Sequence, residues 1–353
     1  MRTWILPATI MVLALLSLVV LSSIAPTLAP RQAVFFLLGG AVFYAASSIS
    51  FSRYQQSHWL GFWTTIALLI LTQVLGQVTR STTSWFTIGG LFAVQPSQLA
   101  VPLVGLSAAV TAARLHMSAL LSVGKYLLLI GVPTLLILTE PDLGTTVIFV
   151  GGMLSILWLA PTRLAHLLGL VAAGLILIFI SWQFLAPYQQ ARISSFVSSE
   201  DPRGAGYNAR QSLIAVGSGG VWGRGLGQGV QSHLRFLPER QTDFIFASLA
   251  EEFGLLGSLL VLSLYAAVVF TLVRTGVYSD HPAAQYFCLA MATALFLQIM
   301  VNIGMNTGIM PITGITLPLL SYGGSSVIAT CGMLGIVQGI VRQMPKSQAV
   351  LIS

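Results

Sequence analysis

The sequence predicts an all-α protein that crosses a membrane many times, and two observations carry this prediction. The chain of 353 residues is 56% hydrophobic and only 7% charged, whereas a soluble globular protein has about 25% charged residues. Its apolar residues also run in stretches of about 20, the length that a helix needs to cross a bilayer. So few charges cannot cover a water-exposed surface of this size. The composition therefore excludes a soluble enzyme, a nucleic-acid-binding domain and a disordered chain.

Ten stretches have the length and composition of transmembrane helices. Lipid offers no hydrogen bonds to the backbone, so each stretch must be helical unless the chain closes into a barrel. The stretches lack the strict alternation of barrel strands. They cover residues 4–24, 33–51, 60–78, 98–112, 120–138, 143–160, 167–184, 254–273, 286–305 and 325–341. We expect a single integral membrane domain, residues 1–353.

Basic residues in the short loops predict the orientation of these helices. With a cytoplasmic N-terminus, the inner loops hold seven Arg or Lys and the short outer loops hold Arg31 and Arg80, as the positive-inside rule favours. Ten helices then place both termini in the cytoplasm. One long loop, about residues 185–242 between the seventh and eighth helices, lies outside. A loop of this length in a compact protein is usually functional.

The segment F-L-P-E-R-Q-T-D-F-I-F-A-S-L-A-E-E-F-G, residues 236–254, holds the main candidate residue at the outer face. Asp243 precedes a strongly apolar helix and fits a helix N-cap, which is the structural explanation for it. About 31 residues separate Asp243 from Arg274, roughly 46 Å of helix, and the hydrocarbon core is only about 30 Å thick. The helix must tilt, break or begin outside the lipid. In each case Asp243 lies at the outer boundary.

Three further outer segments have distinctive sequence patterns. T-E-P-D-L-G-T-T, residues 139–146, is a tight turn in which Asp142 begins the next helix. Trp85 lies in an outer loop, where the interfacial aromatic belt is the alternative explanation. Residues 305–326 are apolar but are broken by glycines and prolines. Such backbone at membrane depth must be buried in protein or line a cavity, so we expect a re-entrant loop over a cavity.

The sequence also lacks several motifs. It has no P-loop, no dinucleotide fingerprint, no H-E-x-x-H and no G-x-S-x-G. The glycine-rich stretch at residues 217–229 matches none of these motifs, and a flexible loop is its simplest interpretation. We therefore expect no nucleotide cofactor. The substrate must already be activated, or the process must be binding or transport.

Four motifs follow one another along the chain: P-D-L-G-T, G-Y-N-x-x-Q-S-x-x-A-x-G-S-G-G, F-L-P-E-R-x-T-D-F-I-F-A-x-x-A-E-E-x-G and P-L-x-S-Y-G-G-S-S. Together they resemble the SEDS family (shape, elongation, division and sporulation), and within it the elongation branch. The resemblance implies ten helices in the bacterial cytoplasmic membrane. It also implies an outward-facing peptidoglycan glycosyltransferase, which joins lipid II disaccharides with release of undecaprenyl diphosphate for cell elongation and rod shape. The implied partners are a class B penicillin-binding protein and other elongation-complex membrane proteins, without nucleic acid.

The resemblance also assigns individual residues. The family's essential aspartate falls on Asp243, and the outer-loop tryptophan falls on Trp85. Two positions depart from the family pattern. Ser84 stands where the family often has Arg, and Gln98 stands where it has Glu, so this chain offers no such charges there.

The expected reaction joins an acceptor hydroxyl to the anomeric carbon of a lipid-linked donor. Asp243 is either the general base or the ligand of a divalent cation, Mg²⁺ or Mn²⁺, with Glu239 and Asp142 as co-ligands. Arginines would hold the diphosphate oxygens by bidentate contacts. We expect the substrate to contact Glu239, Arg240, Thr242, Trp85, Asp142, Arg210 and Arg224.

Two other functions remain open from the sequence. A flippase for a lipid-linked cell-wall precursor would share the apolar helices and the cavity, but its polar groups should cross the midplane at paired broken helices. Here the acidic residues concentrate at the outer rim. A scaffold that only seats a transpeptidase would not need Asp243.

Overall fold

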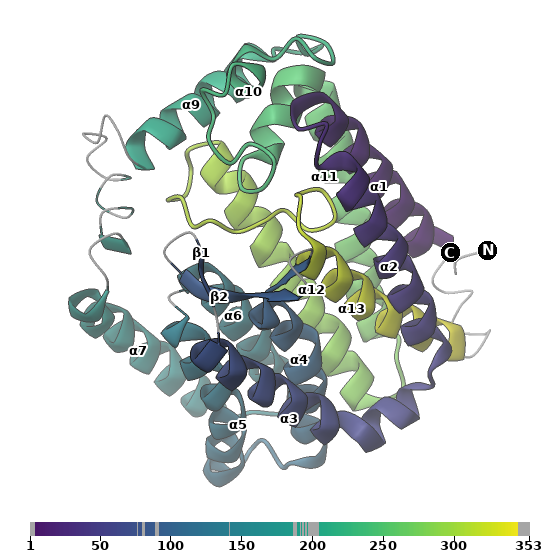
Figure 1. The fold of residues 1–353 in the computed structure, drawn as a ribbon. Coiled ribbons are helices and arrows are strands. Elements are labelled where there is room, and N and C mark those ends of the chain that lie inside the picture. Colours follow the sequence, from purple (N-terminus) through teal and green to yellow (C-terminus); the bar gives the residue numbers. More distant parts are fainter. Residues whose placement is uncertain are drawn as a thin grey trace.

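The computed structural model is a bundle of long helices (Figure 1). It describes residues 4–75, 77–79, 82–88, 92–140, 142–185, 189–190, 192, 194, 196 and 205–344. The long helices are α1 (Ile5–Ile24), α2 (Ala29–Ser48), α3 (Phe51–Leu75), α4 (Pro96–Arg114), α5 (Leu120–Thr139), α6 (Leu143–Leu159), α7 (Leu164–Ser181), α11 (Ile245–Val277), α12 (Pro282–Asn306) and α13 (Gly324–Gln343). The loop after α7 adds η2 (Trp182–Phe184), α9 (Ala205–Ser218) and α10 (Val230–His233).

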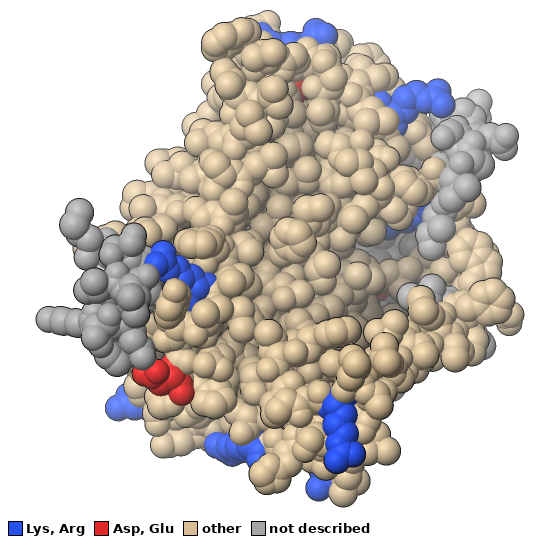
Figure 2. Space-filling model, turned by 180° about the vertical axis from the view of Figure 1, so that it is seen from behind, with Lys and Arg blue, Asp and Glu red and all other residues tan. Residues whose placement is uncertain are grey.

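The helices have the character of a multi-pass membrane protein. Within the described residues, eight helices are long and apolar enough to cross a membrane, namely α1, α2, α4, α5, α7, α11, α12 and α13. The apolar helix α6 is shorter, and α3 carries Arg53 and His58 in its first half. Figure 2 shows a broad face almost without charged side chains, which gather near its margins. Each predicted stretch overlaps one long helix, while the number of crossings stays a prediction.

A small antiparallel sheet joins α3 to α4, where the sequence predicted only an outer loop. Its strands are β1 (Gln77–Thr79), β2 (Thr82–Ile88) and β3 (Phe92–Val94), in that order. Gln77 of β1 lies opposite Trp85 of β2. Threonine, aromatic and branched residues in β2 favour extended backbone, which is the local reason for this strand. The all-α prediction is therefore incomplete at this segment.

The helix α11 breaks at Gly254, which has φ 65° and ψ −158°. The glycine-rich loop lies against this break, and the Arg224 amide donates to the Glu251 carbonyl at 2.9 Å. The Leu255 amide donates to the Gly220 carbonyl, also at 2.9 Å. A Cβ on Gly254 would lie 2.6 Å from the Val221 carbonyl oxygen. The loop thus satisfies backbone groups that the break exposes, and its interpretation as a flexible loop was wrong.

The segment between α12 and α13, residues 307–323, has no regular helix; it is mostly buried from Ile315 to Ser321, whereas Ile309 and Gly314 are exposed. Leu317 and Leu320 are fully buried. Hydroxyls from neighbouring helices satisfy its carbonyls. Ser17 of α1 donates to the Leu320 carbonyl at 2.7 Å, and Tyr265 of α11 donates to the Pro318 carbonyl at 2.6 Å. Irregular backbone away from water needs such partners, and they fix this segment in the centre of the bundle (Figure 1).

Candidate active site

Asp243 lies in a tight turn that precedes α11. The amides of Thr242, Asp243 and Phe244 all donate to the Glu239 carbonyl, at 3.1, 3.1 and 3.3 Å. Glu239 adopts left-handed backbone with φ 50°. The buried side chains of Leu237 and Phe244 anchor the turn at its two ends. The local sequence therefore folds into a rigid corner with Asp243 on it.

The turn also packs against the segment that precedes α13. The Ser321 hydroxyl donates to the Thr242 carbonyl at 2.6 Å, and the Tyr322 amide donates to the Gln241 carbonyl at 2.9 Å. The Thr242 hydroxyl donates to Glu239 Oε2 at 3.1 Å. Two residues that we expected to contact substrate, Glu239 and Thr242, thus contact each other and shape the turn.

Two asparagines of α12 hold the backbone of Asp243. Nδ2 of Asn302 and Nδ2 of Asn306 each donate to the Asp243 carbonyl at 3.0 Å. Both asparagine side chains are fully buried. Asn306 Oδ1 accepts from the Ala247 amide in the first turn of α11 at 3.0 Å. Asp243 is therefore positioned through its main chain.

Asp243 is not the N-cap residue of α11. The N-cap position is occupied by Phe244, whose side chain makes no cap hydrogen bond. The half-buried carboxylate instead faces Gly314, where an added Cβ would lie 3.6 Å from Asp243 Oδ2 and 3.7 Å from Arg192 Nη1. Arg192 Nη1 also donates to the Thr313 carbonyl at 3.2 Å. An arginine that the sequence did not single out is therefore near the candidate carboxylate.

Asp142 lies on the other side of the same central segment and acts as the N-cap of α6. Its Oδ1 accepts from the Thr145 amide at 2.9 Å, and its Oδ2 accepts from Gln95 Nε2 at 2.9 Å. Gly144 packs directly on Ile315, whose carbonyl accepts from Asn302 Nδ2 at 2.6 Å. Asp142 thus serves the structural role that the sequence offered as one alternative.

The predicted cations lie on separate elements and do not form one cluster. Arg240 donates through Nε and Nη2 to the Ile24 carbonyl at the end of α1, at 3.3 and 3.1 Å. Burial lowers the pKa of Arg240, and nearby Arg235 lowers it further. Arg224 is exposed and donates to the Ser218 carbonyl at 3.3 Å.

The remaining predicted contacts lie on separate elements. Arg210 is exposed on α9. Trp85 belongs to β2, and its side chain, like that of Ser84, lies outside the described residues.

The described residues provide only part of the ligand set that we expected for a divalent cation. Among the described residues, no group of three or more His, Cys, Asp or Glu side chains could hold a metal ion. Glu239 Oε2 accepts from Thr242 and Gln241, and Asp142 serves as a helix cap. A cation here would depend on Asp243 and on oxygens of the substrate, as Mg²⁺ commonly does at phosphate sites.

Comparison with known proteins decides the family. The family model of the cell cycle proteins FtsW, RodA and SpoVE matches residues 1–346. The chain belongs to the FtsW/RodA/SpoVE family. It is 41% identical to the peptidoglycan glycosyltransferase MrdB of Escherichia coli (strain K12) over 284 residues, which are 78% of this chain and 75% of MrdB. This is the family that the four motifs indicated.

Solved structures of FtsW/RodA/SpoVE relatives share the fold. A chain of a peptidoglycan synthase complex, studied for how it coordinates polymerization and crosslinking, matches with a TM-score of 0.83 and 28% identity, covering 96% of this chain and 97% of that one. The rod shape determining protein RodA of Thermus thermophilus matches with a TM-score of 0.73 and 27% identity, covering 96% of each chain.

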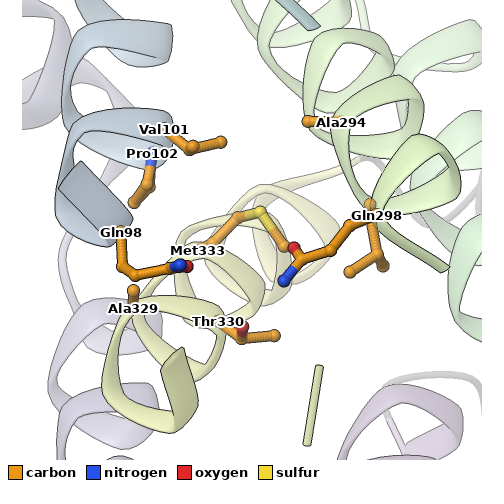
Figure 3. A pocket seen from close by; sticks show the side chains of 9 residues that line it. Gln98, Val101, Pro102, Ala294, Gln298, Ala329, Thr330 and Met333 are labelled. Carbon is orange, nitrogen blue, oxygen red and sulfur yellow. The ribbon is translucent and has the colours of Figure 1, made fainter. Parts of the chain in front are cut away.

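Gln98, which replaces a glutamate of the FtsW/RodA/SpoVE pattern, lines a small cavity inside the bundle. The cavity of about 20 Å³ lies between α4, α12 and α13, with Gln298 and Thr330 on its other walls (Figure 3). Gln298 Nε2 donates to the Thr316 carbonyl at 3.0 Å. This volume suits one water molecule, which needs about 10–15 Å³. The partly buried Gln98 side chain places a neutral amide, not a charge, at this cavity.

Two glutamates of the motif A-E-E-x-G, Glu251 and Glu252, are buried. Glu251 accepts from the amides of Gln231 and Ser232 at 2.8 and 3.0 Å. Glu252 Oε1 accepts from the Gly227 amide at 3.1 Å and lies 3.0 Å from His233 Nε2. Their partners are backbone amides of a distant loop, which no local sequence pattern identifies.

Proposed function

We propose that this chain is a peptidoglycan glycosyltransferase that joins lipid II disaccharides into glycan strands and releases undecaprenyl diphosphate. One observation carries the proposal. Asp243 is fixed through its backbone by Asn302 and Asn306, directly before the first turn of α11. The similarity to MrdB, a peptidoglycan glycosyltransferase, supports it.

The proposed chemistry needs one base and one stabilised leaving group. The Asp243 carboxylate accepts the proton of the acceptor hydroxyl, a role that typically contributes about 10²–10⁴-fold to the rate. The hydroxyl oxygen bonds to the anomeric carbon of the donor. The bond between that carbon and the phosphate oxygen breaks, and its electron pair leaves on the diphosphate. Because the leaving group is already a diphosphate, no nucleotide is required.

Asp243 also fits the second role that the sequence left open. A divalent cation, Mg²⁺ or Mn²⁺, would supply charge neutralisation for the diphosphate when bound by Asp243 and substrate oxygens. Polymerisation measured in a chelator distinguishes the metal-ligand role of Asp243 from its role as general base. Loss of polymerisation in a chelator, with recovery on added Mg²⁺ or Mn²⁺, supports the ligand role. Full activity in the chelator, with a pH–rate profile that Asp243→Glu shifts, supports the base.

The proposal includes an orientation and a partner. We place the ten long helices across the bacterial cytoplasmic membrane, with both termini inside and Asp243 at the outer face. The structural similarity to a chain of a peptidoglycan synthase complex supports the proposal of a crosslinking partner. We assign that role to a class B penicillin-binding protein, alongside other elongation-complex membrane proteins.

Purified protein and lipid II test the proposal. The protein is incubated in detergent and in lipid vesicles, with and without a class B penicillin-binding protein. Glycan strands that depend on Asp243 are the expected product. Movement of labelled lipid across vesicles without polymer would instead indicate a flippase. Strands that Asp243→Ala leaves unchanged would contradict the assigned site.

A further inference from the structure

A cavity of about 180 Å³ opens between α9 and the segment that follows α12. Its lining includes Arg192, Phe196 and Arg210 from the loop after α7, and Gly308 and Pro311 from the segment after α12. Pockets for whole drug-sized ligands span about 300–1,000 Å³. This cavity is smaller, so it suits one group of a large substrate rather than an entire lipid-linked disaccharide.

The cavity has two guanidinium groups but no carboxylate among its lining residues. Guanidinium groups bind phosphate and carboxylate oxygens in bidentate geometry. The lining therefore selects an anionic group with several oxygens. The remainder of the lining is mainly apolar and includes the exposed side chains of Phe196 and Leu213.

Arg192 connects the cavity to Asp243. It lines the cavity, and its Nη1 lies at the same point beside Gly314 as Asp243 Oδ2. The two atoms are no further apart than the sum of their distances to that point, 3.7 and 3.6 Å. A ligand held at Arg192 is therefore next to the carboxylate.

Asn306 fixes the cavity wall and Asp243 relative to each other. Its side chain donates to the Asp243 carbonyl, while its main-chain carbonyl accepts from the Ser212 hydroxyl of α9 at 2.8 Å. Ser212 lies two residues after Arg210 on that helix. The position of Arg210 and the position of Asp243 thus depend on one buried residue.

We propose that this cavity is the subsite for the diphosphate of the lipid-linked donor, with Arg192 and Arg210 as its ligands. The inference rests on the glycosyltransferase function proposed above. When the bond between the anomeric carbon and the phosphate oxygen breaks, the electron pair remains on the diphosphate beside the two guanidinium groups. The acceptor oxygen takes the place of the phosphate on that carbon, and its proton passes to Asp243.

Direct binding tests the subsite without any need for turnover. Native mass spectrometry of the full chain in detergent compares undecaprenyl diphosphate with undecaprenyl monophosphate, for the wild type, Arg192→Gln and Arg210→Gln. Arg235→Gln is the matched control, because Arg235 is an exposed arginine of the same outer region that does not line the cavity. We expect each cavity variant to bind the diphosphate lipid about tenfold more weakly, the loss of one charge-assisted hydrogen bond. The monophosphate lipid should be affected less, and Arg235→Gln should match the wild type.

Three results would overturn the subsite. If both cavity variants bind the diphosphate lipid with wild-type affinity, the two arginines do not contribute to binding it. If the cavity variants lose the same affinity for the diphosphate and monophosphate lipids, the cavity does not select the diphosphate. If the cavity variants bind lipid II more weakly but bind its peptide-free form normally, the cavity binds the carboxylates of the peptide. Tight diphosphate binding by a wild type that makes no glycan would instead contradict the glycosyltransferase function and leave the subsite in place.

Discussion

Asn306 donates its side-chain amide to the main-chain carbonyl of Asp243 at 3.0 Å, and it receives the Ala247 amide on its side-chain oxygen. This one residue of α12 therefore ties the turn before α11 to the first turn of that helix. Because Asn306 is fully buried, these hydrogen bonds have no competition from water. The backbone of Asp243 is thus held in place from a neighbouring helix, and Asn302, four residues earlier on that helix, has the same role.

Replacing Asn306 by alanine should misplace Asp243 more than it unfolds the protein. Leaving buried partners unpaired costs about 1–3 kcal/mol, and an active-site displacement of about 1 Å can reduce a rate about 10²-fold. We expect the polymerisation rate from lipid II to fall to that extent. Thr307→Ala is the control, because the Thr307 hydroxyl bonds only within its own helix end. Equal rates for Asn306→Ala and Thr307→Ala would refute the positioning role.

Glu140 should make stability depend on pH. Its side chain is fully buried next to Thr72, and burial, with a contribution from Asp142, raises the pKa from 4.5 to about 7. Below pH 4.5 the carboxyl is protonated in the folded and unfolded chains, so it has no effect. As the pH rises toward 7 the unfolded chain loses its proton first, and the folded state loses about 3 kcal/mol in total.

Glu140→Gln tests this dependence, since glutamine keeps the acceptor for Thr72 without the charge. We expect the variant to raise the thermal unfolding temperature in detergent at pH 8 and to have little effect at pH 4.5. An equal increase at both pH values would show that ionisation of Glu140 is not the cause.

Gly254 should be intolerant of any side chain. Its backbone is left-handed, and an added Cβ would meet the Val221 carbonyl oxygen at 2.6 Å as well as the Gly223 amide. Gly254→Ala should therefore detach the glycine-rich loop from α11 and lower stability by more than about 1 kcal/mol. Gly217→Ala is the control, because nothing lies within 4 Å of its added Cβ. Limited proteolysis of the loop checks the result, and equal protection in both variants would count against this role.

The features that could be predicted from the sequence are those that depend on local residue patterns. Apolar runs located the helices, and the distance from Asp243 to Arg274 required a tilt, a break or an early start, which Gly254 supplies as a break. The breaker residues between α12 and α13 predicted buried irregular backbone. The motif order indicated the family that the comparison assigns.

The remaining site features depend on contacts between distant segments. Arg192 approaches Asp243 only because both lie beside Gly314, and Glu251 binds amides of a loop about 20 residues earlier. A signal did exist for the asparagines. Asn302 and Asn306 are four residues apart on one face of a largely apolar helix, a spacing that brings side chains together and marks a polar contact inside the bundle.

The most direct test of the central claim is polymerisation of lipid II by purified Asp243→Asn. The amide keeps the size of the side chain and removes its charge and basicity, while the backbone contacts with Asn302 and Asn306 remain. We predict wild-type thermal stability, retained binding of undecaprenyl diphosphate, and a glycan yield at least about 10²-fold lower. Glycan strands made at the wild-type rate by this variant would contradict the central claim.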